Sequence, residues 1–461
     1  MKKQILLMMC ATAMFSSCGI YNSYKRPADI KVEGLYRDTV AVNDTLMGDT
    51  TNMANLSWRE MFRDPKLQVL IEQALAHNVN VQSAMLQVKQ AQASLTSARL
   101  SFLPSFTLSA QGGITKMENT PSYRTWQAPV TASWEADLFG KLLNTSRGAK
   151  AALLQSKAYE QAVRSQIIAN VANLYYTLLM LDRQLEISEE TYGKWTQTLE
   201  MMKYMMDAGM TNGAAVAQTE ASCYSVAASI PEIRQAIRET ENSLSTLLDM
   251  VPQQIDRGRL ENQEMPEQIS AGVPLQMLAN RPDVRAAEMS LANAFYLTNK
   301  ARSSFYPQIS VTGTLGWTNG TTGTMNPAQI LKNAVASLTQ PIFNRGALVA
   351  NLKISKAQQE QAKLNFQQAV LDAGAEVSNA LFAYKTVSEK SIQRDKQVES
   401  LEKAVEATAD LMNTGQTTYL DVITAQQSLL GAQLTQVQDD YEHLQSVINL
   451  YQALGGGRTG E

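Results

Sequence analysis

Hydrophobic residues recur at alternating steps of four and three along the C-terminal part of the chain. A spacing that averages 3.5 residues keeps one stripe of a helix facing a partner along a supercoil. After Gly415 the same spacing resumes at Ile423 and continues to Tyr451. We therefore predict a long antiparallel helical hairpin with its turn at Gly415. Its first stripe, polar at three positions, consists of Phe366, Val370, Ala373, Val377, Ala380, Tyr384, Val387, Ser391, Arg394, Val398, Leu401, Val405, Thr408 and Met412.

The chain repeats this plan, and the repeat is its strongest organising signal. Ser101-Phe102-Leu103-Pro104 matches Ser304-Phe305-Tyr306-Pro307 at an offset of 203, and Gly209 matches Gly415 at an offset of 206. We predict a first repeat over residues 64–249, a connector over 250–281 and a second repeat over 282–454. Each repeat is expected to hold a helix, a β-hairpin, a long helix and a further helix, over residues 65–101, 105–135, 144–207 and 214–249 in the first and 282–303, 308–339, 346–412 and 420–454 in the second.

The predicted strands alternate between apolar and polar residues. Trp126 and Trp134 share one face eight residues apart, and Trp317 continues a similar alternation in the second repeat. This spacing suits the two aromatic girdles of a membrane barrel, whose apolar band is about 25 Å tall. Pro129 lies between the two tryptophans and is expected at a bulge or an irregular edge. A soluble hairpin that caps a helical bundle is the alternative; we favour membrane strands.

Four strands cannot stand alone in lipid, because the two edges of their sheet would be unpaired. Bacterial barrels close with eight or more strands. The sequence therefore predicts an assembly of at least two chains.

The N-terminus has the features of a secretory signal over residues 1–17, with a basic pair, a short apolar run and small residues before Cys18. Ser16-Ser17-Cys18 is typical of a lipoprotein signal, although Phe15 departs from the usual leucine. An ordinary signal cleaved nearby is the alternative. We expect lipid on Cys18, an extended lipid-anchored segment over residues 18–63 and a loose tail over residues 455–461.

The composition argues against catalysis and against nucleic-acid binding. The formal net charge is −3, and the two histidines, His77 and His443, are isolated in the sequence. No cysteine or histidine stands at the spacing of a metal site, and no glycine-rich segment carries the lysine of a phosphate loop. We therefore expect no enzyme activity, no metal and no cofactor beyond a covalent lipid, so that any transport energy must come from a partner.

Several motifs accompany the repeat: Ser16–Cys18, the two Ser-Phe-X-Pro junctions, Asp137–Lys141, Leu278–Val284 and the tip from Gly415 to Val422. In this combination the chain resembles the TolC-like outer-membrane factor family, in its lipoprotein branch. The resemblance implies a homotrimer in which a 12-stranded β-barrel in the outer membrane of a Gram-negative bacterium continues into a 12-helix periplasmic tunnel. It also implies a periplasmic adaptor protein and an inner-membrane pump as partners.

The resemblance also assigns roles at the periplasmic tips. Gly209 and Gly415 are expected both to cap their helices and to let adaptor hairpins approach closely. Asp421 is the candidate gate residue, where three carboxylates would repel one another and raise their apparent pKa. The alternative is that Asp421 only stabilises the start of its helix.

This chain departs from the family's gate pattern. Met412, Thr417 and Thr424 stand where better-studied members carry a tyrosine, an arginine and a second aspartate, and Ala215 replaces another aspartate of some members. The closed state is therefore expected to depend on one ring of carboxylates and on packing.

Two other functions compete with the efflux channel. One is a lipid-anchored periplasmic coiled-coil structural or adaptor protein without a channel. The other, within the transporter class, is a secretion duct for peptides or proteins. The exported cargo and the identity of the pump stay open at this level.

Overall fold

The structure is a computed structural model that describes residues 22–27, 56–116, 118, 121–264, 281–319 and 329–457. The chain divides into two compact units. Among the described residues, unit 1 draws on residues 22–27 and on those within Leu86–Ala158 and Arg285–Ala369, and unit 2 on the remaining segments. The predicted signal peptide, Cys18 and the connector residues 265–280 lie outside the described residues.

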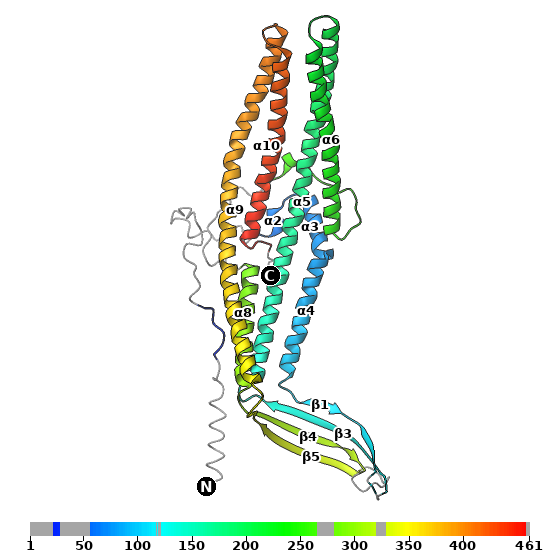
Figure 1. Ribbon diagram of the computed structural model, residues 1–461, viewed down its shortest axis with the longest axis vertical. Coiled ribbons are helices and arrows are strands. Elements are labelled where there is room, and N and C mark those ends of the chain that lie inside the picture. The colour runs from blue at the N-terminus through cyan, green and yellow to red at the C-terminus, as the bar shows by residue number, and fades with distance from the viewer. Residues whose placement is uncertain are drawn as a thin grey trace. The chain divides into compact units, whose positions relative to one another are not determined.

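Unit 1 is built around an antiparallel sheet to which both repeats contribute (Figure 1). The strand order is β1-β3-β4-β5, and β2 also pairs with β3. The two hairpins join because β3, from the first repeat, pairs with β4, from the second. The strands are β1 (Ser105–Leu108), β2 (Gln111–Thr115), β3 (Tyr123–Ala136), β4 (Gln308–Thr318) and β5 (Gln329–Thr339).

One face of this sheet is apolar and the other is polar. Successive residues of a strand point to opposite faces, and residues paired across strands share a face. The apolar face carries two charged exceptions among the described residues, Arg124 towards one end and Lys332 near the middle. Its other members are Phe106, Leu108, Gly112, Ile114, Trp126, Ala128, Val130, Ala132, Trp134, Ala136, Ile309, Val311, Gly313, Leu315, Trp317, Ile330, Ala334, Ala336 and Leu338.

Pro129 interrupts the ladder without shifting its register. Leu108 faces Val130 and Gln111 faces Gln127, so no residue is inserted between β1 and β2. The Pro129 carbonyl still accepts a bond of 3.1 Å from the Ser109 amide, but proline has no N–H to return. The expected bulge is therefore absent. The edge is nevertheless interrupted opposite Pro129, because β1 ends at Leu108 and β2 begins at Gln111, while β4 pairs with β3 on the other side without a break.

Gly316 of β4 lies directly opposite this proline. A side chain at position 316 would overlap the backbone of Pro129 and the carbonyl of Ala128. The close approach of the two strands therefore requires glycine here.

Four helices meet the sheet in unit 1. The hydroxyl of Thr298 on α8 donates to the Ser355 carbonyl of α9 at 3.0 Å, and Gly148 of α5 lies against Asn293 of α8. The elements are α4 (Val79–Leu100), α8 (Pro282–Ser303) and the first parts of α5 (Lys141–Asp207) and α9 (Ala347–Asn413).

Unit 2 contains the remaining helices. They are α2 (Trp58–Met61), α3 (Pro65–His77), α6 (Gly213–Leu247), the 3-10 turn η4 (Leu260–Asn262) and α10 (Tyr419–Ala453), together with the second parts of α5 and α9. No helix in the described part of the chain combines the length and the hydropathy needed to cross a membrane.

The first helix of the first repeat is broken, so the single helix expected over residues 65–101 is wrong. Asn78 takes an extended conformation, with φ −56° and ψ 129°, between α3 and α4. Its side-chain oxygen accepts from the Asn80 amide at 2.9 Å, and its amide nitrogen donates to the Leu247 carbonyl at 2.9 Å. Asparagine competes with helix continuation in this way because its side chain can replace the backbone partners at a helix start.

The predicted heptad stripe of α9 is buried, which confirms the hairpin. Phe366, Val377 and Val398 are each exposed by less than a tenth. The polar stripe residue Arg394 pairs with Asp439 of α10 at 2.9 Å, and Asp439 is 2% exposed. Lys390 contacts the same carboxylate at 2.9 Å. A buried polar pair at one seam position can fix the register of two helices.

The chain after α10 is packed, so the loose tail expected from residue 455 is wrong for residues 455–457. These three glycines are buried. The Gly456 carbonyl accepts from the Ser165 hydroxyl at 2.7 Å, and the Gly457 amide donates to the Tyr451 hydroxyl at 2.7 Å. Residues 458–461 lie outside the described residues.

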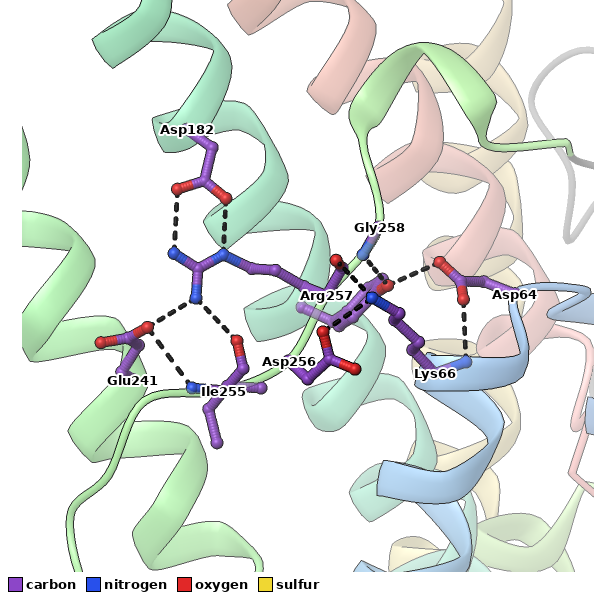
Figure 2. A network of polar contacts seen from close by, with 9 residues as sticks. Asp64, Lys66, Asp182, Glu241, Ile255, Asp256, Arg257 and Gly258 are labelled. Carbon is purple, nitrogen blue, oxygen red and sulfur yellow. Dashed lines mark hydrogen bonds and ion pairs between the residues drawn. The ribbon is translucent and has the colours of Figure 1, made fainter.

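The described part of the connector crosses unit 2 through a network of charged groups (Figure 2). Arg257 donates to both oxygens of Asp182 on α5, at 2.5 and 2.9 Å, and to Glu241 on α6 at 2.5 Å. The bond to Asp182 is the main cause that raises the pKa of Arg257. Through these bonds Arg257 joins the connector to both helices of the first hairpin. Its side chain is only 12% exposed.

A second set of contacts ties the connector to the start of α3. Lys66 pairs with Asp256 at 2.7 Å (Figure 2). The Tyr175 hydroxyl donates to Asp64 at 2.5 Å and accepts from the Gly258 amide at 2.9 Å. Three segments far apart in the sequence are thereby held together.

Candidate gate and docking surface at the helix tips

The two tip turns have the same local structure. Gly209 follows α5 and Gly415 follows α9, each with φ +73°. The Met210 amide bonds the Met205 carbonyl at 2.8 Å, and the Gln416 amide bonds the Leu411 carbonyl at 2.9 Å. These six-to-one bonds define Schellman caps, in which glycine adopts the left-handed conformation at low cost.

The space around both tip glycines is open. The first carbon of a side chain added at Gly209 or Gly415 would meet no atom within 4 Å. Within the single chain, glycine is therefore needed at both positions for the left-handed backbone conformation, since a larger side chain would have room.

Asp421 lies in the first turn of α10 and is fully exposed. Its Oδ2 accepts from the Thr417 hydroxyl at 2.6 Å, from the Thr418 hydroxyl at 2.6 Å and from the Thr418 amide at 3.0 Å. The bond from Thr417 is the first cause that lowers the pKa of this carboxylate in the single chain. Asp421 thus caps its helix, and it also presents a stably ionised group at the tip.

The three residues that replace the family's gate partners are occupied locally. Thr417 donates to Asp421, and the Thr424 hydroxyl donates to the Leu420 carbonyl one turn back at 2.8 Å. The Met412 carbonyl accepts the Gly415 amide at 3.0 Å within the cap. Within the described residues, the Asp421 carboxylate at the tip therefore has hydroxyl groups as hydrogen-bond donors and no cationic partner.

Tyr419 is a tip residue that the heptad pattern, as predicted above, did not include. It packs against two core clusters, one that contains Trp195 and Cys223 and one that contains Met202 and Val216. Its hydroxyl is buried without a hydrogen-bond partner, and burial raises its pKa to about 12. Tyr419 therefore joins α10 of the second hairpin to α5 and α6 of the first.

The heptad stripe by itself does not reach Tyr419. The alternating step before Ile423 is one of three residues and leads to Leu420, which is 57% exposed. Tyr419 lies four residues before Ile423, about one helical turn away, and Ile423 belongs to the same core cluster as Trp195. The helix α10 begins at Tyr419, one residue before the expected start at Leu420.

A groove of about 760 Å³ lies between the first long helix and the second hairpin within unit 2. Asp440 and His443 of α10 line it together with Glu190 and Glu261. Partial burial and the nearby Asp395 carboxylate raise the pKa of Asp440 to about 6. Burial lowers the pKa of His443, so at neutral pH the wall formed by α10 is acidic.

The three tryptophans proposed for the aromatic girdles share the apolar face of the sheet. Trp317 pairs in register with Ala128, next to Trp126, and Trp134 pairs with Val311 near the other end. They are exposed by 39% (Trp126), 42% (Trp134) and 55% (Trp317). The indole nitrogen of Trp134 donates to the Phe102 carbonyl at 2.9 Å, as expected for a ring with one polar and one apolar side.

No group of three or more potential metal ligands from His, Cys, Asp and Glu is found among the residues that the structure describes. The lipid attachment proposed for Cys18 falls outside those residues.

Comparison with known proteins places the chain in one family. The family model for outer membrane efflux proteins matches residues 70–249 and 273–456. The cation efflux system protein CusC of Escherichia coli K12 is 27% identical over 460 residues, which cover 98% of this chain and 99% of CusC. The probable outer membrane lipoprotein SilC of Salmonella typhimurium is 28% identical over 410 residues, which cover 87% of this chain and 88% of SilC.

A solved channel has the same fold. The open state of the MtrE outer membrane channel of Neisseria gonorrhoeae matches with a TM-score of 0.85 at 25% identity, over 95% of this chain and 98% of MtrE. These findings confirm the predicted family and fold class. The chain belongs to the outer membrane efflux protein family and is an outer-membrane channel of a tripartite efflux system.

Proposed function

We propose that three copies of this chain form a passive duct through the outer membrane, with a gate at the helix tips. A periplasmic adaptor and an inner-membrane pump complete the exporter and supply its energy. The observation that carries the proposal is the sheet of unit 1, which has one apolar face and two open edges.

The open edges call for further copies. β1 and β2 border one edge and β5 the other, so the chain offers four strand positions. Each unpaired backbone group costs roughly several kcal/mol of free energy in lipid, so closure of the sheet into a barrel is favoured. Three copies supply twelve positions, above the eight of the smallest bacterial barrels.

The gate is assigned to Asp421. Three copies would bring three such carboxylates to the axis if the tips converge. Hydroxyl donors from Thr417 and Thr418 keep each carboxylate ionised. Mutual repulsion within the ring acts in the opposite direction, so the ring would favour a bound cation.

Lipid on Cys18 is proposed as a second anchor beside the barrel. The support is the Ser16-Ser17-Cys18 pattern and the similarity to SilC, a probable outer membrane lipoprotein. We assign the choice of cargo to the pump and adaptor.

A matched pair of substitutions tests the duct. Ala132→Lys places a charge on the apolar face, whereas Ser133→Lys places it one residue away on the polar face. A lysine at the lipid side of a barrel costs about 2–4 kcal/mol near the bilayer midplane. We expect purified Ser133→Lys protein to form channels in planar bilayers, as the wild type does, and Ala132→Lys protein to insert poorly.

Two results would contradict the proposal. Absence of discrete conductance steps from the wild type would favour the structural or adaptor alternative. Equal insertion of both lysine variants would show that the apolar face does not meet lipid.

A further inference from the structure

The N-terminal segment of residues 22–27 packs on α8 within unit 1 (dark blue in Figure 1). Arg26 forms a two-pronged pair with Glu288, in which Nε lies 2.9 Å from Oε1 and the second nitrogen contacts Oε2. The Tyr24 amide donates to the Tyr296 hydroxyl at 3.3 Å, and the Tyr24 ring meets Phe295 edge-on, with centroids 5.9 Å apart.

Glu288 is an unusual residue to bury. It is 7% exposed, and Arg26 is the ionic partner that the structure gives it among the described residues. A buried carboxylate is stable only when it is paired or hydrogen-bonded, and a planar arginine fork matches it best. The surface of α8 is therefore complementary to a segment that carries arginine at this place.

The internal repeat provides a comparison within the same chain. At the offset of 203, α4 carries Met85, Gln92 and Ala93 where α8 carries Glu288, Phe295 and Tyr296. The equivalent helix of the first repeat therefore lacks the carboxylate and both aromatic rings. Of these two equivalent helices in the described part of the chain, α8 alone carries the surface, as expected if it serves the single N-terminus.

The direction of the segment decides where the N-terminus leads. Arg26 meets α8 at residue 288 and Tyr24 meets it at residues 295 and 296, so the segment runs antiparallel to α8. Towards Cys18 it therefore points to the Ser303 end of α8, which leads into β4. Seven helical residues from Tyr296 to Ser303 span about 10 Å. Six residues of extended chain from Tyr24 to Cys18 reach about 20 Å.

We propose that Glu288, Phe295 and Tyr296 of α8 form a receptor for the chain's own N-terminal segment and hold the acylated Cys18 within reach of the membrane edge of the sheet. The lipid part of this inference rests on the proposed function. The docking part rests on the contacts of Tyr24 and Arg26. When the N-terminal segment is docked on α8 in this way, the lipid on Cys18 lies near the end of α8 that leads into the sheet of unit 1.

Trypsin offers a direct test, because the bond after Lys25 is its natural target and the Arg26–Pro27 bond resists it. Full-length protein carrying an alkyne fatty-acid label is purified in detergent and digested briefly. Lys31 and Arg37 are further trypsin sites, so only the labelled fragment that ends at Lys25 is scored, by its mass. We expect Glu288→Gln and Arg26→Gln to release this fragment at least about tenfold faster than the wild type, since the loss of a charge-assisted pair frees the segment. Ser23→Ala, a change at an exposed position of the same segment, is expected to match the wild type.

A charge exchange separates docking from folding damage. Arg26→Glu alone should be cleaved rapidly, and Arg26→Glu combined with Glu288→Arg should recover at least part of the protection with an identical cleavage site. Rates within twofold of the wild type for both glutamine variants, or no recovery in the exchange, would overturn the receptor.

The lipid is scored separately. Mass spectrometry of the shortened chain reports cleavage whether or not the label is present. Glu288-dependent protection without any label would keep the receptor and remove the lipid anchor, whereas labelled protein with Glu288-independent cleavage would remove the receptor alone.

Discussion

Replacing Gly415 by leucine tests whether the second tip is only a helix cap or also a docking surface. The structure separates the two costs. The position has φ +73°, and a new side chain would meet no atom within 4 Å of its first carbon. The change should therefore destabilise the folded chain by about 1–2 kcal/mol of left-handed strain and by no internal clash.

Gly431 provides the matched control. It lies inside α10, has equal room and has no positive φ. Gly431→Leu should stabilise the helix by roughly 0.5–1 kcal/mol, because glycine is a poor helix former. The two leucine variants should thus differ in unfolding free energy by about 2 kcal/mol, with opposite signs relative to the wild type.

The assay combines thermal unfolding of the purified assembly with cross-linking to the periplasmic adaptor in cells. We expect Gly415→Leu to lose most cross-linking at a temperature where its fold is intact, and Gly431→Leu to retain it. Undiminished cross-linking by folded Gly415→Leu protein would show that the glycine is required for its backbone conformation alone. An unfolding cost well above about 2 kcal/mol would show that the space around the turn is not open in the assembly.

The remaining predictions concern charge, stability and the anchor. Asp421→Asn should abolish both the block of single-channel current by divalent cations added at the periplasmic end and its relief by acid; Asp410→Asn, another exposed carboxylate of the same tip, should retain both, and equal block in the two variants would leave Asp421 as a helix cap. Arg257→Ala should lower the unfolding free energy by about 3–5 kcal/mol, because two partly buried carboxylates lose their common partner; a loss below about 1 kcal/mol, measured by denaturant unfolding, would mean that solvent already screens them. Asp440→Asn should raise the melting temperature at pH 7.5, and this gain should vanish below about pH 4. A carboxyl whose folded pKa is raised to about 6 stabilises the fold when protonated and loses that contribution as the pH rises through 6. A gain in melting temperature that does not depend on pH would point to packing. Cys18→Ala should remove fatty-acid labelling while channels still form, and persistent label would place the acyl group elsewhere.

Periodicity made the helices of this chain predictable. The heptad stripe from Phe366 to Met412 requires a buried residue every 3.5 positions on average, and the order of apolar residues in the sequence shows this spacing directly. The duplicated junctions and tip glycines were equally visible, because a cap needs glycine for its own backbone. The Gly415 cap therefore follows from a few consecutive residues.

Breaks within the elements were harder to predict. Asn78 lies in a stretch of good helical pattern, and it ends α3 because its amide reaches the Leu247 carbonyl, 169 residues away. Pro129 was expected at a bulge or an irregular edge; the edge is interrupted opposite it between β1 and β2, but pairing with β4 holds the register and Gly316 makes room for the close approach. In both cases a distant backbone decided which local preference prevailed.

The sequence by itself determined the repeated order of elements, the alternating faces of the strands and the caps at the tips, because each depends on neighbours within one or two turns. Tertiary structure alone decided the partners of the polar groups: Arg394 with Asp439, Arg26 with Glu288, and Arg257 between two helices. A charged side chain at a buried position needs a partner, but the sequence does not say which residue that partner is. A buried ion pair joins residues that only the folded backbone brings within about 3 Å of each other. For the same reason the packing of Tyr419 against both hairpins appeared only when α5, α6 and α10 were placed side by side.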